Sequence, residues 1–204
     1  MGSGTGAIIE PRCISKLPEV SCSFEFEVLD NIGEFKGTRN EHTGLHINEE
    51  KCATIIVGDS REGWVNAFLL LLRIATGQED TNKVVIDLSH VRPANTPIQG
   101  FGGVSNPVKL AHFYRRAGEI LQKAYGRKLT SVECCLLLDE SSLAVVAGNV
   151  RRSAGMRQFI SNDELAAVAK DNLWQQGEDG KWRIDPERDA LRMANHTRVF
   201  HHKP

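Results

Sequence analysis

The sequence predicts an α/β fold, a sheet or barrel of strands that alternate with helices along the chain. Apolar strand-like runs at residues 53–57, 84–88 and 145–150 are separated by longer segments in which apolar residues recur every three or four positions. The second and third runs are apolar on both faces, as strands inside parallel sheets are. We therefore expect parallel strands that are covered by helices.

The first 57 residues are expected to form strands joined by polar segments. Residues 7–14 and 24–29 are rich in β-forming residues, and the glutamates of the second run alternate with apolar neighbours, which predicts one solvent-facing side. Residues 30–51 contain few large apolar side chains and several glycines, so a long loop or a hairpin is expected there. The short strand at 53–57 follows.

Helices are expected before and after the strand at 84–88 in the sequence. Asp59 and Glu62 have the spacing of a capping box, and the helix that they begin ends at Gly77. Apolar residues on one face predict a second helix over residues 108–124.

The last third of the chain begins with another capping box, Thr130 and Glu133, which starts a helix that continues to about residue 143. The strand at 145–150 follows it. The remaining expected elements are a helix at 163–172, a turn at 176–182, a short helix at 186–193 and a strand at 197–200.

The composition is that of an ordinary globular domain. The 204 residues are enough for one domain with a sizeable core, and 41% of them are hydrophobic and 25% charged. A formal net charge of −1, without a polybasic field, argues against a nucleic-acid binder. The longest apolar run, near residues 68–72, is too short to cross a membrane, and no apolar signal segment follows Met1. We therefore expect a cytoplasmic protein with neither nucleic acid nor a membrane as partner.

Cysteine and histidine patterns predict no metal site. The five cysteines are an odd number without a Cys-x-x-Cys pair, which argues against a disulfide framework or a zinc site: Cys13, Cys22, Cys52, Cys134 and Cys135. The last two lie in an apolar run and are expected to be small buried hydrophobic residues. Three histidines near the chain end could ligate a metal, but no supporting spacing exists and a solvated tail is favoured: His196, His201 and His202.

Arginines that follow apolar strands are candidate ligands for phosphate groups. Arg92 comes after one such strand and precedes a glycine loop at residues 100–103, whose backbone amides could approach a phosphate or a ribose hydroxyl. An ordinary strand-to-helix loop is the alternative. Arg151 and Arg152 follow a later strand; one could enter a site while the other pairs with a structural carboxylate, or both could be solvated.

Five sequence blocks extend the prediction to function. They are residues 2–6 (Gly-Ser-Gly-Thr-Gly), 59–64 (Asp-Ser-Arg-Glu-Gly-Trp), 85–93 (Val-Ile-Asp-Leu-Ser-His-Val-Arg-Pro), 100–103 (Gly-Phe-Gly-Gly) and 146–154 (Val-Ala-Gly-Asn-Val-Arg-Arg-Ser-Ala). In this order and spacing, the chain resembles an internal piece of an adenosylcobalamin-dependent (class II) ribonucleotide reductase of the monomeric, triphosphate-reducing kind. Five ordered blocks are far more specific than any one of them.

The resemblance implies part of a ten-stranded α/β barrel together with its effector-binding region. Residues 1–57 would be strands and a loop of the effector region, and residues 58–204 would be early barrel strands and helices. In the complete enzyme, adenosylcobalamin generates a thiyl radical on a finger-loop cysteine, and a cysteine pair reduces the ribose of a ribonucleoside triphosphate. A thioredoxin-type reductant regenerates the pair, and a deoxynucleoside triphosphate effector sets which base is reduced.

The same resemblance assigns residues to two binding sites and none to catalysis. The effector site and specificity loop would use Asp59, Arg61, Trp64, Arg92, Gln99, Gly102 and Gly103. The substrate pocket would use Ser105, Asn149, Arg151, Arg152 and Asn195. After Gly103 the family usually has Ala-Ser-Gly-Pro, whereas this chain has Val-Ser-Asn-Pro, and Asn106 adopts left-handed backbone less freely than glycine.

The catalytic cysteines of the family have no counterpart here. The radical cysteine lies in an Asn-Pro-Cys-Gly sequence, which this chain lacks, and neither reducing cysteine has a match. By the family's chain order, one reducing cysteine would precede Met1 and the radical cysteine would follow Pro204. We therefore expect the chain alone to be inactive, with the remaining part of a split enzyme as a partner. Unpaired barrel strands also predict poor solubility or oligomers.

Two alternatives to a part of the enzyme stay open from the sequence. One is a stand-alone nucleotide-binding regulatory module without catalysis. The other is a truncated product with no stable fold. The neighbouring coding sequence would discriminate between them, because missing halves of the enzyme beside this chain would support a split reductase.

Overall fold

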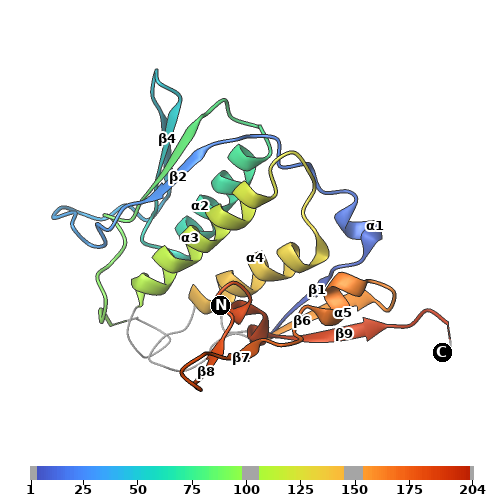
Figure 1. The fold of residues 1–204 in the computed structure, drawn as a ribbon. Helices are drawn as coiled ribbons and strands as arrows, with labels where there is room; N and C mark the ends of the chain where they lie inside the picture. Colours follow the sequence, from blue (N-terminus) through green and yellow to red (C-terminus); the bar gives the residue numbers. More distant parts are fainter. Residues whose placement is uncertain (1–3, 98–105, 145–153, 203–204) are drawn as a thin grey trace.

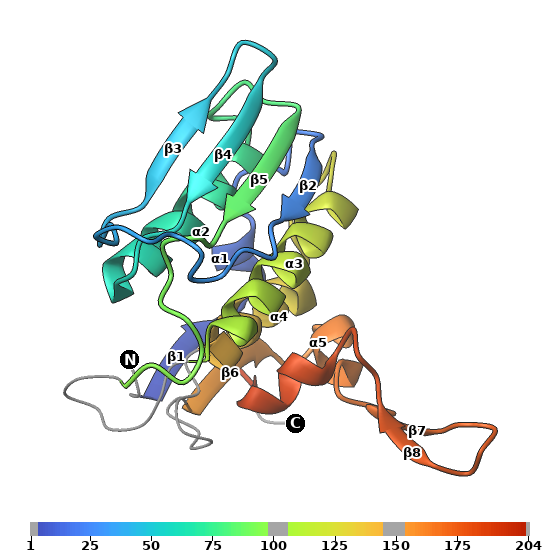
Figure 2. The same cartoon turned by 90° about the vertical axis from the view of Figure 1, so that its left-hand side faces the viewer.

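A computed structural model describes residues 4–97, 106–144 and 154–202 of the chain. The fold is α/β, as expected: a four-stranded sheet and a three-stranded sheet lie on opposite sides of a layer of helices (Figure 1). A small two-stranded hairpin projects from the body beside the three-stranded sheet (Figure 2). Within the described residues, no helix is long and apolar enough to cross a membrane.

The four-stranded sheet has the strand order β2-β5-β4-β3. Its strands are β2 (Glu25–Val28), β3 (Gly44–Ile47), β4 (Cys52–Ile56) and β5 (Lys83–Asp87). The three strands β2, β5 and β4 are parallel, and β3 pairs with β4 in an antiparallel hairpin. The polar segment at 30–51 therefore contains a hairpin strand. The sheet combines strands from both sides of residue 57.

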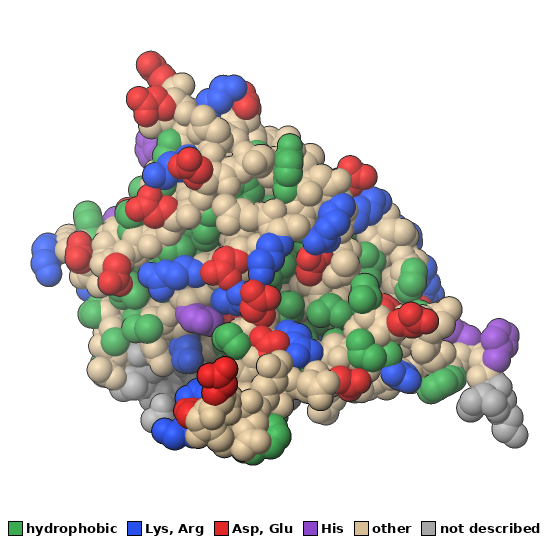
Figure 3. All heavy atoms as spheres, viewed as in Figure 1, with side chains coloured by type: hydrophobic (Ala, Val, Ile, Leu, Met, Phe, Trp, Pro, Cys, Tyr) green, Lys and Arg blue, Asp and Glu red, His purple; other side chains and the backbone are tan. Residues whose placement is uncertain are grey.

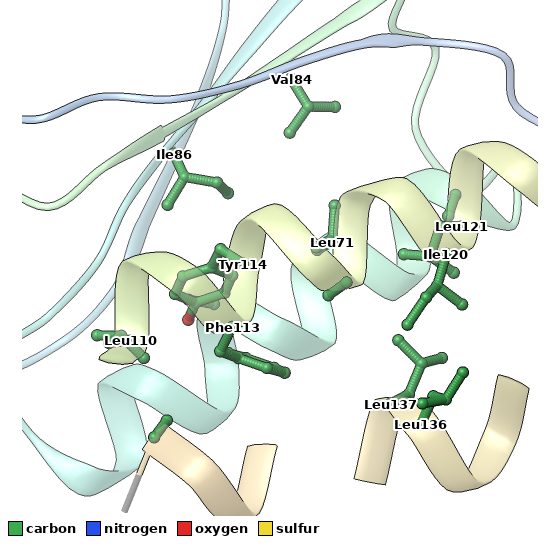
Figure 4. Close-up of a cluster of buried hydrophobic side chains, with 14 of the residues drawn as sticks. Leu71, Val84, Ile86, Leu110, Phe113, Tyr114, Ile120, Leu121, Leu136 and Leu137 are labelled. Atoms are coloured by element: carbon green, nitrogen blue, oxygen red, sulfur yellow. The ribbon is translucent and has the colours of Figure 1, made fainter. Parts of the chain in front are cut away.

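One face of this sheet is covered by two helices, α2 (Arg61–Ala75) and α3 (Pro107–Lys123), as Figure 2 shows. The strand residues that face the helices are completely buried: Ala53, Ile55, Val84 and Ile86. Figure 4 shows Leu71, Phe113 and Leu121 in the same cluster. The periodicity of the sequence predicted both helices within two residues. Ser60 caps α2, since its Oγ accepts from the Gly63 amide at 2.9 Å, and the expectation of Asp59 as the cap was wrong.

The helix α4 (Ser131–Ala144) packs between α3 and the three-stranded sheet. The predicted capping box is present: Thr130 N donates to Glu133 Oε2 at 2.9 Å, and Glu133 N donates to Thr130 Oγ1 at 3.2 Å. Cys134 and Cys135 are buried, as expected, and burial raises the pKa of the Cys135 thiol to about 12. Buried side chains lie on all sides of α4, which is typical of a helix enclosed by protein.

The three-stranded sheet is parallel, with β6 in the centre. It consists of β1 (Gly4–Ile8), β6 (Ala154–Ile160) and β9 (Ala194–Val199). The strand expected at 7–14 was wrong in its second half, because the chain turns into the short helix α1 (Pro11–Ile14), with Pro11 in its first turn. The strand expected at 145–150 lies outside the described residues.

The segment between β6 and β9 contains four short elements. They are α5 (Glu164–Val168), β7 (Trp174–Gln176), β8 (Trp182–Ile184) and the 3-10 helix η1 (Asp189–Met193). The predicted turn at 176–182 is the β7–β8 turn, where Gly180 has a φ of +73°. The expected helices at 163–172 and 186–193 are shorter than predicted, and the last strand begins three residues earlier.

The distribution of charged side chains on the surface is consistent with the near-neutral net charge of the chain. On the face shown in Figure 3, acidic and basic side chains are interspersed and no broad area carries one charge. Such a surface gives no electrostatic footprint for nucleic acid on that face.

The close contact of α3 with β2 provides a test of this packing. A Cβ at Gly118 would lie 2.3 Å from the Phe26 ring, so Gly118→Ala should destabilise the fold by about 1–3 kcal/mol, although alanine ordinarily favours helices. Urea unfolding measures the change. Adding Phe26→Leu should recover part of the loss because it removes the obstructing ring. Unchanged stability in Gly118→Ala would contradict this packing.

Candidate functional site

Of the twelve site residues predicted from the sequence, the structure describes five. Seven lie outside the described residues: Gln99, Gly102, Gly103, Ser105, Asn149, Arg151 and Arg152. The five that it describes are Asp59, Arg61, Trp64, Arg92 and Asn195. Asp59 and Arg92 are in contact, and Asn195 lies in the other sheet.

Asp59 and Arg92 meet at the carboxyl edge of the four-stranded sheet. Asp59 follows β4 and Arg92 follows β5, and these neighbouring strands are parallel, so their carboxyl ends lie together. Arg92 Nε donates to Asp59 Oδ1 at 2.9 Å, and the Arg92 amide donates to the same oxygen at 3.1 Å. The Asp59 side chain is 13% exposed and that of Arg92 is 30% exposed. Arg92 therefore has a structural partner and still reaches solvent.

The segment from residue 31 to residue 43 crosses this edge and holds it in place. Asn31 Nδ2 donates to Asp87 Oδ1 at 2.8 Å, and the Leu88 amide donates to Asn31 Oδ1 at 3.0 Å. The carbonyl of Asn40 accepts from the Asp59 amide at 2.8 Å. The Asn40 amide in turn donates to His90 Nδ1 at 3.1 Å. These contacts fix the backbone beside the Asp59–Arg92 pair.

Sequence reasoning missed Asn31, Asn40 and His90 as parts of this edge. His90 is 8% exposed and its ring stacks on Phe35 with centroids 3.9 Å apart. A usable signal was present, because both residues come shortly after strands of the four-stranded sheet, His90 after β5 and Asn31 after β2. Their partners are 50 to 57 positions away in the chain, which local patterns do not reveal.

The beginning of α2 is pressed against the same segment. Thr43 Oγ1 accepts from the Gly58 amide at 3.0 Å and donates to the Gly63 carbonyl at 2.6 Å. A Cβ at Gly58 would lie 2.4 Å from the Glu41 carbonyl oxygen, so only glycine permits this approach. The helix amino terminus thus lies beside Asp59.

Trp64 and Arg61 occupy different environments on the first turn of α2. Trp64 is half-buried and packs against the core, and its carbonyl accepts from Tyr114 Oη at 3.2 Å. Among the described residues, its indole Nε1 has no hydrogen-bond partner. Burial strongly raises the pKa of the Tyr114 hydroxyl, which keeps it a donor. Arg61 lies on the exposed side of the turn.

Asn195 belongs to the three-stranded sheet and pairs in register with Met156 of β6. Both residues are exposed, on the face opposite Arg157 and His196. Burial, with Lys170 and Arg157 nearby, lowers the pKa of His196 to about 4, so this imidazole is neutral at pH 7. The described residues contain no group of three or more side chains placed to hold a metal.

A protein-family model matches the part of the chain that contains Asp59 and Arg92. The model for the insertion domain of B12-dependent ribonucleotide reductases matches residues 34–121, which include Asp59, Arg92 and most of α3. The match thus covers much of the four-stranded sheet and its helices.

Curated relatives match a larger share of the chain. The adenosylcobalamin-dependent ribonucleoside-triphosphate reductase of Levilactobacillus brevis is 34% identical over 183 residues, which are 83% of this chain and 24% of that protein. The enzyme of the same name from Lactobacillus helveticus is 30% identical over 241 residues, 95% of this chain and 32% of the relative. The chain therefore spans a quarter to a third of the length of these two relatives.

A solved structure has the same fold. The crystal structure of a B12-dependent (class II) ribonucleotide reductase superposes with a TM-score of 0.72 and 24% identity. The superposition covers 97% of this chain and 27% of that one. Both sheets and the helices between them thus correspond to one part of the larger fold.

The Asp59–Arg92 contact can be tested by its contribution to stability. Asp59→Ala should lower the free energy of unfolding by about 1–3 kcal/mol, because it leaves a half-buried guanidinium and the Arg92 amide without their acceptor. Asp179→Ala is the matched control: its ion pair with Arg183 is exposed, so its loss of stability should be much smaller than that of Asp59→Ala. Equal losses in urea unfolding would show that Asp59 has no special role in this edge.

Proposed function

Because the chain belongs to the family of B12-dependent ribonucleotide reductases, we propose that it is the part of such an enzyme that carries an effector site and early strands of the substrate barrel. The proposed activity of the complete enzyme is the reduction of ribonucleoside triphosphates to deoxyribonucleotides. The observation that carries the proposal is the convergence of Asp59, Arg92 and the amino terminus of α2 at one sheet edge.

This edge has the chemistry that a deoxynucleoside triphosphate requires. The carboxyl ends of parallel strands and a helix amino terminus favour anions. The Arg92 guanidinium offers charge-assisted hydrogen bonds to phosphate oxygens, and the Asp59 carboxylate can accept from a sugar hydroxyl. Arg92 also precedes the residues that resemble the specificity loop, Gln99, Gly102 and Gly103, which supports an effector site here.

The three-stranded sheet supports the barrel part of the proposal. One face packs against α4, whereas the other leaves Ile8 48% and Met156 44% exposed. Parallel sheets ordinarily have both faces covered. We therefore assign β1, β6 and β9 to the ten-stranded barrel, with Asn195 on the interior face toward the substrate. Ser105, Asn149, Arg151 and Arg152 are the further proposed pocket residues.

We propose that the described residues do not provide the radical chemistry itself. Adenosylcobalamin would generate a thiyl radical on a cysteine; Cys134 and Cys135 are buried, and Cys13, Cys22 and Cys52 are partly exposed but lie outside the sequence that holds the family's radical cysteine. No residue described here is assigned to the cofactor. The cofactor, the thioredoxin-type reductant and the reducing cysteines are proposed to act with the remaining part of the enzyme.

A stand-alone nucleotide-binding module is the second candidate function. The observation that favours it is that both Asp59 and Arg92 lie within the region matched by the insertion-domain model, residues 34–121. The main contacts of the proposed effector edge are thus made without β1, β6 or β9. Such a module would bind a deoxynucleotide and perform no reduction.

Calorimetry with the four deoxynucleoside triphosphates tests the effector site. We expect at least one to bind with a dissociation constant no better than the high micromolar range, since ordering the loop costs free energy. Arg92→Ala should weaken that binding by about 10- to 100-fold, the equivalent of one charge-assisted contact of about 1.5–3 kcal/mol.

Arg183→Ala, which removes an exposed arginine of the β7–β8 hairpin, is the control and should bind as wild type does. Thermal unfolding of Arg92→Ala shows whether the fold persists after loss of the Asp59 contact. Equal nucleotide binding by Arg92→Ala and wild type would remove Arg92 from the site, and no binding to wild type would refute the effector site.

A further inference from the structure

Two stacked aromatic rings lie where the segment 31–43 crosses the edge of the four-stranded sheet. The ring of Phe35 stacks on that of His90, with centroids 3.9 Å apart and planes 24° from parallel. His90 is only 8% exposed, whereas Phe35 is 39% exposed. His90 is thus the inner ring of the stack, and Phe35 is the ring that a molecule in solution can contact.

The backbone around Phe35 fixes the position of its ring. Phe35 N donates to the Ser89 carbonyl at 3.3 Å. Gly33 adopts a φ of +73° beside Pro93, whose Cβ would be 3.1 Å from a Cβ at residue 33. A Cβ at Gly37 would lie 2.8 Å from Cε1 of Phe35, so glycine at this position leaves the edge of the ring uncovered. A ring that is held in advance loses little freedom when a ligand stacks on it.

The stack is connected to the Asp59–Arg92 pair through the backbone of Asn40. The Asn40 amide donates to His90 Nδ1 at 3.1 Å, and the Asn40 carbonyl accepts from the Asp59 amide at 2.8 Å. His90 also precedes Arg92 by two residues in the loop after β5. The aromatic ring, the carboxylate and the guanidinium therefore lie along the same sheet edge.

The proposed nucleotide site lacks a partner for the base. Arg92 is proposed to bind phosphate oxygens and Asp59 a sugar hydroxyl, and neither contact involves the base. Bases stack on aromatic side chains, and every base has the π-face that such stacking needs. Phe35 is an exposed ring at this edge. Other exposed aromatic residues in the described part of the chain lie after α3, on the β7–β8 hairpin and after β9: Tyr125, Trp174, Trp182 and Phe200.

We propose that Phe35 stacks on the base of the deoxynucleoside triphosphate bound at this edge, with His90 supporting the ring from the inner side. This assignment rests on the proposed effector site. It adds the residue that distinguishes a nucleotide from a bare polyphosphate. Stacking recognises the face of a base and not its hydrogen-bonding groups, so Phe35 raises the affinity for any of the four deoxynucleotides.

NMR titration of the isotope-labelled 204-residue chain tests the stacking. The ligands are dATP, dGTP, dCTP, dTTP and inorganic tripolyphosphate, which has the phosphates without a base. Wild type should bind at least one deoxynucleotide at least about fivefold more tightly than tripolyphosphate. Phe35→Leu should weaken binding of that nucleotide at least about fivefold, because leucine has no π-face, and should leave the dissociation constant of tripolyphosphate within about twofold.

Two variants serve as controls. Phe35→Tyr keeps the ring and should bind the nucleotide within about twofold of wild type. Phe200→Leu makes the same chemical change as Phe35→Leu at an exposed position after β9, and it should bind both kinds of ligand as wild type does.

Phe35→Trp keeps the test decisive if Phe35→Leu fails to fold. A base stacked on the new indole should quench its fluorescence, and tripolyphosphate should not. The wild-type signal from Trp64, Trp174 and Trp182 is subtracted.

The possible failures are distinguishable. Equal nucleotide binding by wild type and Phe35→Leu, or an equal loss of nucleotide and tripolyphosphate binding in Phe35→Leu, would overturn the stacking role alone. Wild type that binds tripolyphosphate as tightly as every nucleotide would also overturn it, because the base would then contribute nothing. Wild type that binds no nucleotide would overturn the effector site as well.

Discussion

The fold depends on the enclosure of α4 between two layers. This helix packs against α3 and against β6, α5 and η1, and so joins the four-stranded sheet with its helices to the parallel three-stranded sheet (Figure 1). A helix enclosed in this way must bury residues on every side, and α4 therefore lacks the usual polar stripe. Two of its carboxylates, Asp139 and Glu140, are buried, and each accepts a hydrogen bond from an arginine, Asp139 from Arg157 of β6 and Glu140 from Arg116 of α3.

The two proposed sites lie in different parts of the fold, one at the edge of the four-stranded sheet and the other on the three-stranded sheet. The effector edge is built from loops that follow parallel strands, and a segment from earlier in the chain clamps it through Asn31 and Asn40. The strands that are proposed to carry the substrate pocket, β6 and β9, lie on the other side of α4. Their uncovered face agrees with the observation that the chain spans only a quarter to a third of the two reductases compared above.

The sequence predicted the elements that local periodicity controls. Strands β4 and β5 and helices α2, α3 and α4 were predicted within two residues, because their apolar spacing and glycine stops are local signals. Strand β6 was missed because Arg157 and Gln158 interrupt its apolar pattern. Arg157 can be buried only because Asp139, 18 positions earlier, lies opposite, and such a partner is invisible to a local window.

The sequence likewise predicted some residues of the candidate site and missed others. The family resemblance drew attention to Asp59 and Arg92, and the structure brings them together. It also shows that Asp59 accepts from Arg92 and does not cap α2, a role that Ser60 fills. The sequence did not reveal the polar contacts made by Asn31, Asn40 and His90, because they depend on the course of a loop over the sheet edge.

The central claim is that α4 holds the two layers through buried charges that need their partners. Urea unfolding of Asp139→Leu, Arg157→Met and the double variant tests it most directly. Each single variant should lose about 3–5 kcal/mol, because it leaves one buried charge unpaired, and the double variant should lie within about 1 kcal/mol of wild type. Single variants that unfold like wild type, or a double variant whose loss equals the sum of the single losses, would contradict the account.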